Sequence, residues 1–142
     1  MKSLKQLIAA KGGQVHSIRP DATVFEALQL MAQKDIGALL VMDGSRVAGI
    51  MSERAYARKV ILQGRSSQDI PVREIMTPEV VKVDPSRTVE ECMGLMTQRR
   101  IRHLPVCEGD TLIGLVSIGD LVKEVIAEQE QTIKQLESYI HS

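Results

Sequence analysis

Ser117 and Asp120 stand three residues apart, where an apolar run ends and a helical pattern begins. A carboxylate in the first turn of a helix can accept hydrogen bonds from both hydroxyls of a cis-diol such as ribose. The same Ser-x-x-Asp spacing also satisfies free amides at the start of a helix, which is a purely structural interpretation. The residues alone leave both interpretations open.

A basic cluster, Arg99, Arg100, Arg102 and His103, spans the end of one predicted helix and the start of the next predicted strand. Forked, permanently charged guanidinium groups suit phosphate recognition. Cations at the C-terminus of a helix also complement its dipole, and we assign Arg99 and Arg100 to that role. Arg102 and His103 enter the strand, so we expect them to contact a ligand, and His103 to add pH dependence near neutrality.

The composition excludes several kinds of partner. Basic and acidic residues are equal at 18 each, so no general attraction to nucleic acid or an anionic membrane is expected. Aromatic platforms for stacking bases are few. The apolar runs are far shorter than the ~20 residues of a membrane span. The first residues lead into a short amphipathic stretch rather than an apolar signal core, so we expect a cytoplasmic protein.

The residue types that carry out catalysis are not grouped in the sequence. Cys92 and Cys107 are too few and too far apart for a zinc site or a redox pair, and both occupy apolar-patterned positions. We find no nucleophile paired with a base, no metal-ligand set and no glycine-rich phosphate loop. We therefore expect no catalytic residues, no metal and no enzyme activity.

The sequence repeats itself at a constant offset of 65 residues, which no gap interrupts from Val15 to Val125. Each copy starts with a short strand, residues 15–19 or 80–84. A Thr-x-x-Glu capping box and an amphipathic helix follow. Two strands joined by a tight turn at Gly44 or Gly109 come next, and then a further helix.

The pattern predicts an α+β fold of two β-α-β-β-α repeats related by a pseudo-two-fold axis. We place the first repeat at residues 1–70, including a helix suggested by Leu4, Leu7 and Ile8, and the second at residues 71–142. Residues 63–71 form a polar linker, and residues 72–76 a short helix. A long amphipathic helix, residues 121–140, ends the chain, and we expect its last turns to pack on a partner chain.

Several segments resemble the cystathionine β-synthase (CBS) repeat. They are Thr23-Val-Phe-Glu-Ala-Leu, Ile36-Gly-Ala-Leu-Leu-Val, Val47-Ala-Gly-Ile-Met-Ser-Glu-Arg, Glu74-Ile-Met-Thr-Pro, Arg100-Ile-Arg-His-Leu-Pro-Val and Ile113-Gly-Leu-Val-Ser-Ile-Gly-Asp. The resemblance covers roughly nine-tenths of the chain through the duplicated order of these motifs. It implies a tandem pair that binds adenine nucleotides in clefts between its repeats, forms homodimers and has a regulatory role.

The resemblance also implies which residues line two clefts, and it favours the ribose interpretation of Asp120. One cleft would combine Ser117 and Asp120 with Ser17, Ile18, Gly37, Ala38 and Leu39. The other would combine Ser52 and Thr77 with Lys82, Val83, Arg102, His103 and Leu104. Thr77 has a second interpretation, as the end of the preceding helix ahead of a proline.

The second cleft departs from the family pattern, because Ala55 stands where the ribose-binding Asp would be. A lost charge-assisted hydrogen bond removes ~1.5–3 kcal/mol, so affinity there would fall tenfold or more. Arg54, Tyr56 and Arg58 are the neighbouring residues with the potential to compensate.

Two functions follow. The first is a regulatory module that binds AMP, ATP or NAD and passes its output to another, unidentified protein chain. The second is a scaffold that dimerises or docks without binding nucleotide. A rise in melting temperature on adding nucleotide would separate them, since a ligand that binds only the folded state stabilises it.

Overall fold

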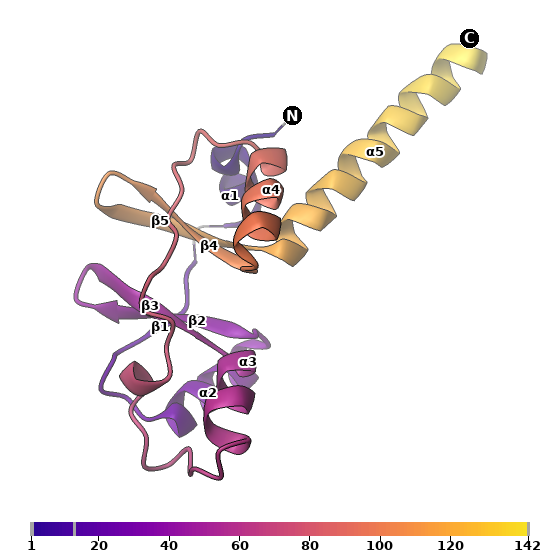
Figure 1. Cartoon of the computed structure of the whole chain (residues 1–142). Coiled ribbons are helices and arrows are strands. Elements are labelled where there is room, and N and C mark those ends of the chain that lie inside the picture. The colour runs from indigo at the N-terminus through magenta and orange to yellow at the C-terminus, as the bar shows by residue number, and fades with distance from the viewer. Residues whose placement is uncertain (1, 13, 142) are drawn as a thin grey trace. The chain divides into compact units, whose positions relative to one another are not determined.

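A computed structural model describes residues 2–12 and 14–141 (Figure 1). It confirms a mixed α and β fold with two small sheets and a long C-terminal helix. The elements in chain order are α1 (Leu4–Lys11), β1 (Ser17–Ile18), α2 (Val24–Lys34), β2 (Ala38–Asp43), β3 (Arg46–Ser52), α3 (Glu53–Tyr56), the π-helical turn η1 (Ala57–Ile61), the 3-10 turn η2 (Val72–Glu74), α4 (Val89–Arg99), β4 (His103–Glu108), β5 (Thr111–Ser117) and α5 (Ile118–His141).

The chain divides into two compact units that do not follow the order of the sequence. The unit that we call the first-repeat unit contains residues 14–81 and 110–112. The second-repeat unit contains residues 82–109 and 113–141 together with residues 2–12, and so includes α1. The N-terminal helix was expected with the first repeat, and it instead completes the second.

The first-repeat unit is built on a three-stranded sheet of order β1-β2-β3. The two residues of β1 pair in parallel with Leu40 and Val41, and β3 runs antiparallel to β2. Ala38 to Val41 are all buried, because β2 is the central strand and apolar on both faces. Helix α2 buries Val24, Ala27 and Met31, spaced as one helical face, in the same core.

Each unit is closed by the segment that precedes the other repeat. In the first-repeat unit, the amide of Val72 donates to the carbonyl of Ala22 (2.7 Å), and the amide of Arg73 to that of Pro20 (3.0 Å). In the second-repeat unit, Leu4 donates to Arg87 (2.9 Å) and Lys5 to Pro85 (3.0 Å). The acceptor carbonyls of the two units are equivalent at the 65-residue offset. The start of α1 and the segment from Val72 therefore bind the same part of the repeat, each in its own unit.

The segment between the repeats is more structured than its composition predicts. Residues 63–71 were expected to be a polar linker, yet Ile70 is 4% exposed and lies in the core of the first-repeat unit. The predicted helix over residues 72–76 shortens to the turn η2, after which Thr77 pairs through its backbone with Ile50. The helix ends here because the backbone of Thr77 forms hydrogen bonds with a neighbouring strand and not with the preceding turn.

The second-repeat unit contains α4, the two-stranded sheet β4-β5 and α5. The strand predicted over residues 80–84 is reduced to one parallel bridge, between Val83 and Val106. Pro105 explains the loss, because proline has no amide to donate to a neighbouring strand. At the equivalent position of the first repeat, the amide of Leu40 donates to the carbonyl of His16 (3.4 Å), and β1 forms.

The predicted turns and helix starts are largely confirmed. Gly44 and Gly109 have φ values of 63° and 59°, as the hairpin turns require. The hydroxyls of Thr23 and Thr88 accept the amides of Glu26 and Glu91. Full reciprocal capping boxes form instead at two other helix starts, Ser3 with Gln6 and Ser117 with Asp120. Among the described residues, no helix is both long and apolar enough to cross a membrane.

Candidate functional site

The junction of β5 and α5 gathers the polar groups that the sequence singled out. The amide of Asp120 donates to the hydroxyl of Ser117 (3.1 Å), and the amide of Ser117 donates to Oδ2 of Asp120 (2.8 Å). The motif therefore forms the capping box of α5. Lys11, at the end of α1, donates to the same Oδ2 atom (2.6 Å) and to the carbonyl of Leu115 (3.0 Å).

The Asp120 carboxylate remains charged and within reach of solvent. Burial by itself raises its pKa, but the bonds from Lys11 and Ser117 outweigh burial and lower the pKa below the ordinary value. Its side chain is 23% exposed. Lys11 and the amide of Ser117 both donate to Oδ2. A charged acceptor therefore stays available beside the cap.

Arg102 and His103 are held next to this junction. The amide of Ile118, the first residue of α5, donates to the carbonyl of Arg102 (2.8 Å), which ties the start of β4 to the start of α5. Burial lowers the pKa of His103; Asp120 opposes this shift, while Lys11 and Arg102 add to it. His103 is therefore neutral at neutral pH, and the pH dependence expected near neutrality moves to the acid side.

These groups form one constellation within the second-repeat unit: a charged carboxylate, an ammonium, a guanidinium and a neutral imidazole. Acceptor and cation lie side by side at the start of a helix, where the dipole also favours negative charge. Such a set can bind hydroxyl donors and anionic oxygens at once. Those are the two kinds of group that a nucleotide's ribose and phosphates present.

The corresponding junction of the first repeat has the cap but not the carboxylate. The hydroxyl of Ser52 accepts the amide of Ala55 (3.1 Å), and the amide of Glu53 donates to the carbonyl of Gly37 (3.1 Å). Both bonds repeat those of Ser117 and Ile118 at the 65-residue offset. Arg54 and Thr77 are exposed. This junction lacks the charged acceptor that Asp120 supplies in the second repeat.

Several predicted site residues have side chains in the core. Ala38, Leu39, Val83 and Leu104 are at most 6% exposed. Their side chains pack against other apolar groups, so they would contact a ligand through backbone atoms alone. Lys82 is exposed. The two predicted clefts each draw on both compact units, and they stay predictions.

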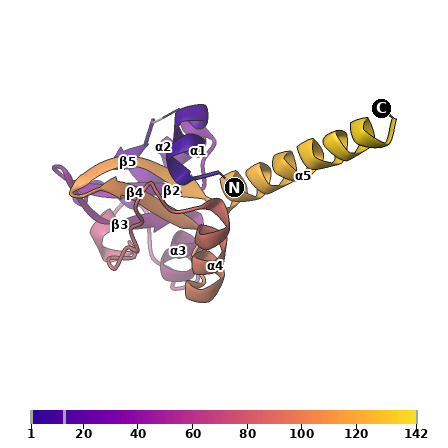
Figure 2. The same cartoon turned by 90° about the horizontal axis from the view of Figure 1, so that it is seen from above.

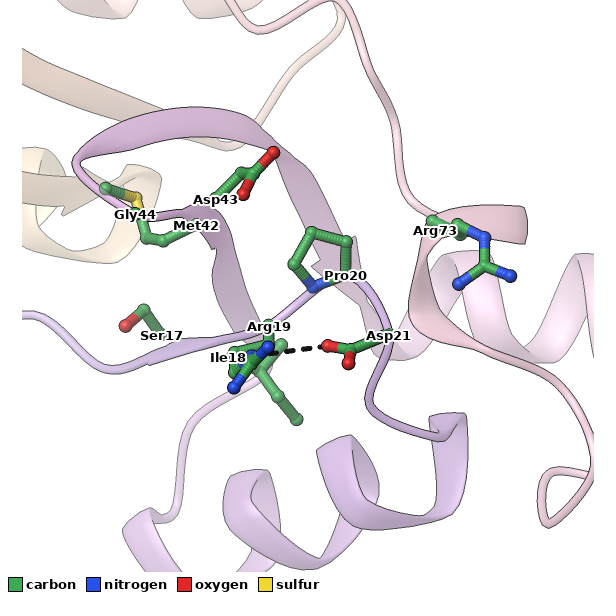
Figure 3. A pocket seen from close by; sticks show the side chains of 9 residues that line it. All are labelled: Ser17, Ile18, Arg19, Pro20, Asp21, Met42, Asp43, Gly44 and Arg73. Carbon is green, nitrogen blue, oxygen red and sulfur yellow. Dashed lines mark ion pairs between the residues drawn. The ribbon is translucent and has the colours of Figure 1, made fainter.

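The first-repeat unit contains its own open pocket, of about 700 Å³ (Figure 3). It lies where the parallel strands β1 and β2 end and includes two predicted site residues, Ser17 and Ile18. The carboxyl ends of parallel strands are the usual place for a ligand in α/β sheets. The pocket is lined by Ser17, Ile18, Arg19, Pro20, Asp21, Met42, Asp43, Gly44 and Arg73.

Three basic residues of these sites were missed from the sequence. Arg19 directly follows β1 and pairs with Asp21 (3.3 Å), so its position beside Ser17 was a usable signal. Arg73 and Lys11 offered none, because they reach their sites through contacts with segments far away in the chain. Lys11 and Asp120 are 109 residues apart.

Comparison with known proteins agrees with the repeat pattern. The CBS domain model matches residues 11–61 and 72–127. The chain is 44% identical over 125 residues to the mitochondrial CBS domain-containing protein CBSX3 of Arabidopsis thaliana, covering 84% of this chain and 61% of that protein. It is 36% identical over 121 residues to the CBS domain-containing protein YhcV of Bacillus subtilis, covering 85% of this chain and 84% of that one.

Solved structures include a close counterpart. A putative signal-transduction protein with CBS domains from Burkholderia ambifaria superposes with a TM-score of 0.87 at 53% identity. The match covers 90% of this chain and 96% of that one. The chain thus spans less than two thirds of the Arabidopsis relative but nearly all of the Burkholderia structure.

Proposed function

Because the chain belongs to the CBS domain family and carries two repeats, we propose that it is a non-catalytic regulatory module that binds an adenine nucleotide, namely AMP, ATP or NAD. Binding would change the conformation or the contacts of the module, and another protein chain would read that change. Such a response requires that the nucleotide bind two states of the module with different affinities.

One observation supports the proposal most directly, the constellation at the start of α5. The charged carboxylate of Asp120 is partly exposed and suits the hydroxyls of a ribose. Lys11, which lies beside it, and Arg102, which directly precedes β4, are cations that suit phosphate oxygens. Formal net charge is zero, so attraction to an anion must come from a local group of this kind. His103 is neutral and half-buried, which suits hydrogen bonding to a ring nitrogen.

The pocket of the first-repeat unit is the second place where a nucleotide group fits. Ser17 offers a hydroxyl, and Arg19 and Arg73 offer guanidinium groups at its rim (Figure 3). Asp21 already neutralises Arg19 in part. We assign this pocket a weaker role than the Asp120 junction because positive and negative side chains nearly balance in it.

Isothermal titration calorimetry with AMP, ATP and NAD tests the proposal, with GMP and inorganic phosphate as controls. We expect saturable binding of at least one adenine nucleotide, and weaker or no binding of GMP and phosphate. Absence of binding at millimolar concentrations would overturn the proposal. Equal binding of GMP and AMP would remove the adenine preference and leave a general phosphate site.

A scaffold that binds no nucleotide is the competing function, and one observation favours it. Ser117 and Asp120 already complete a capping box, and Lys11 already neutralises the carboxylate. In that case the polar groups at the junction stabilise α5 and nothing more. Nucleotides would then leave the melting temperature unchanged.

A further inference from the structure

Helix α5 has two faces with different surroundings in the second-repeat unit. On one face Leu121 is fully buried, Glu124 pairs with Lys2 (3.2 Å), and the backbone amide of Lys2 donates to Glu128 (3.2 Å). Beyond Glu128 every described residue of α5 is exposed. Figures 1 and 2 show this part of α5 extending away from the rest of its own unit.

The other face of α5 carries an exposed seam that is apolar except at Gln129. Val122, Ile126, Ile133, Leu136 and Ile140 are 39%, 50%, 54%, 58% and 75% exposed. Together with Gln129 they alternate in steps of four and three residues, which is the 3.5-residue period of a coiled coil. A helix that covers its own domain also has apolar residues in steps of three and four, but it buries them. Here these residues are exposed, so the seam indicates a partner helix.

We propose that α5 pairs with α5 of a second copy of this chain as an antiparallel coiled coil. In the register that covers most of the seam, Val122 lies opposite the partner's Ile140 and Ile126 opposite the partner's Leu136. Gln129 lies opposite the partner's Ile133. A two-fold axis then passes by Gln131, and each pairing occurs twice.

Charge selects this register among the alternatives. Lys123 flanks the seam opposite the partner's Glu137, and two-fold symmetry forms the ion pair twice. The cost is a single like-charge approach of Glu130 to its own copy at the axis. If the two helices shift by one heptad so that they overlap only near their C-terminal ends, Glu130 lies opposite the partner's Glu137. Val122 then has no residue opposite it. A parallel pair forms no such ion pair and stacks Gln129 on Gln129.

A membrane surface is a poor alternative occupant of the seam. Helices that lie on anionic membranes are rich in lysine and arginine on their polar face. Helix α5 instead carries five carboxylates, Asp120, Glu124, Glu128, Glu130 and Glu137, against two lysines, Lys123 and Lys134. Its net negative charge would repel anionic lipid, whereas in a pair of copies the two Lys123–Glu137 ion pairs offset the repulsion between the helices.

Paired cysteines in the full chain test the orientation. In the proposed register a chain that carries both Ile126→Cys and Leu136→Cys forms disulfide-linked dimers under mild oxidation, while either single variant does not. Within one helix these positions are ~15 Å apart, too far for an internal bond. The unsubstituted chain controls for Cys92 and Cys107. A disulfide-linked dimer of either single variant would show that the helices pair in parallel. Failure of the double variant to form a disulfide-linked dimer would show that the helices do not pair in this register. Either result overturns the proposal.

Charge reversal tests the register independently. Lys123→Glu should weaken dimerisation by about tenfold in sedimentation equilibrium, because two ion pairs become two like-charge pairs. Adding Glu137→Lys to the same chain should restore it. Lys134→Glu, on the outer face of α5, is the matched control and should leave dimerisation unchanged. A chain that stays monomeric, or one that binds anionic lipid vesicles through α5 instead of dimerising, would contradict the proposal.

Discussion

The dual role of the Ser117–Asp120 turn yields the sharpest prediction, because capping and ligand binding respond differently to two substitutions. Asp120→Asn keeps an oxygen that can accept the amide of Ser117 but removes the negative charge beside Lys11. Thr88→Ala removes an equivalent cap, since the hydroxyl of Thr88 accepts the amide of Glu91 (3.2 Å) at the start of α4. Thr88 contributes to neither proposed site, so it is the matched control.

The expected magnitudes separate the two roles. Loss of the Thr88 cap destabilises the fold by about 1 kcal/mol, which lowers Tm by about 3–4 °C for a chain of this size. Asp120→Asn costs up to about 1 kcal/mol of unfolding free energy, because the ion pair it loses is partly exposed. A nucleotide at one hundred times its Kd stabilises the fold by about 2.7 kcal/mol. Replacing a charge-assisted bond weakens binding about 30-fold, which leaves about 0.9 kcal/mol of that stabilisation.

A thermal denaturation scan with and without saturating AMP, ATP or NAD measures both quantities. We expect Thr88→Ala to lower Tm and to keep the full rise on adding nucleotide. Without nucleotide, the Tm of Asp120→Asn should lie close to that of the unsubstituted chain. On adding nucleotide, its Tm should rise by only about one third as much. The reasoning is refuted if the rise is the same in Asp120→Asn and the unsubstituted chain, because the carboxylate would then serve the helix alone.

Three further predictions follow from particular residues. Ala55→Asp restores a carboxylate three residues after Ser52, and calorimetry should show about tenfold tighter nucleotide binding at the first-repeat junction. Burial lowers the pKa of His103 in the folded chain. The contribution of His103 to stability is therefore complete above about pH 6.5 and is lost as the pH falls through the folded-state pKa. Over that range the urea midpoint of His103→Gln should vary less with pH than the midpoint of the unsubstituted chain. A Cβ at Gly49 would lie 2.7 Å from the carbonyl oxygen of Thr77, so Gly49→Ala should destabilise the fold by about 1–3 kcal/mol in urea denaturation, whereas at Gly114 the nearest atom is the mobile tip of Ile8 and the cost should be smaller.

The repeat architecture could be predicted because its signals are local and occur twice. Thr23 and Thr88 mark helix starts, and Gly44 and Gly109 mark hairpin turns, and each signal acts on residues at most a few positions away. The same locality explains one error. Pro105 removes a strand bond that its counterpart Leu40 makes, and periodicity alone does not register a missing amide.

The non-local contacts could not be predicted from patterns of this kind. The affiliation of α1 with the second-repeat unit depends on bonds from Leu4 and Lys5 to residues 80 or more positions away. Lys11 reaches Asp120 only because α1 is docked there. Apolar spacing identified α1 as a helix. That spacing does not indicate which of the two similar repeats α1 packs against.

The two repeats act as internal controls for the meaning of Asp120. Ser52 caps its helix by accepting the amide of Ala55, and Ser117 caps α5 by accepting the amide of Asp120, both at 3.1 Å. A helix start in this fold therefore forms without the carboxylate. Asp120 adds a second cap bond to a helix of 24 residues, whose stability depends little on one terminal bond. The charge of Asp120 and its ion pair with Lys11 are thus more than capping requires, and we propose ligand binding as the role that uses them.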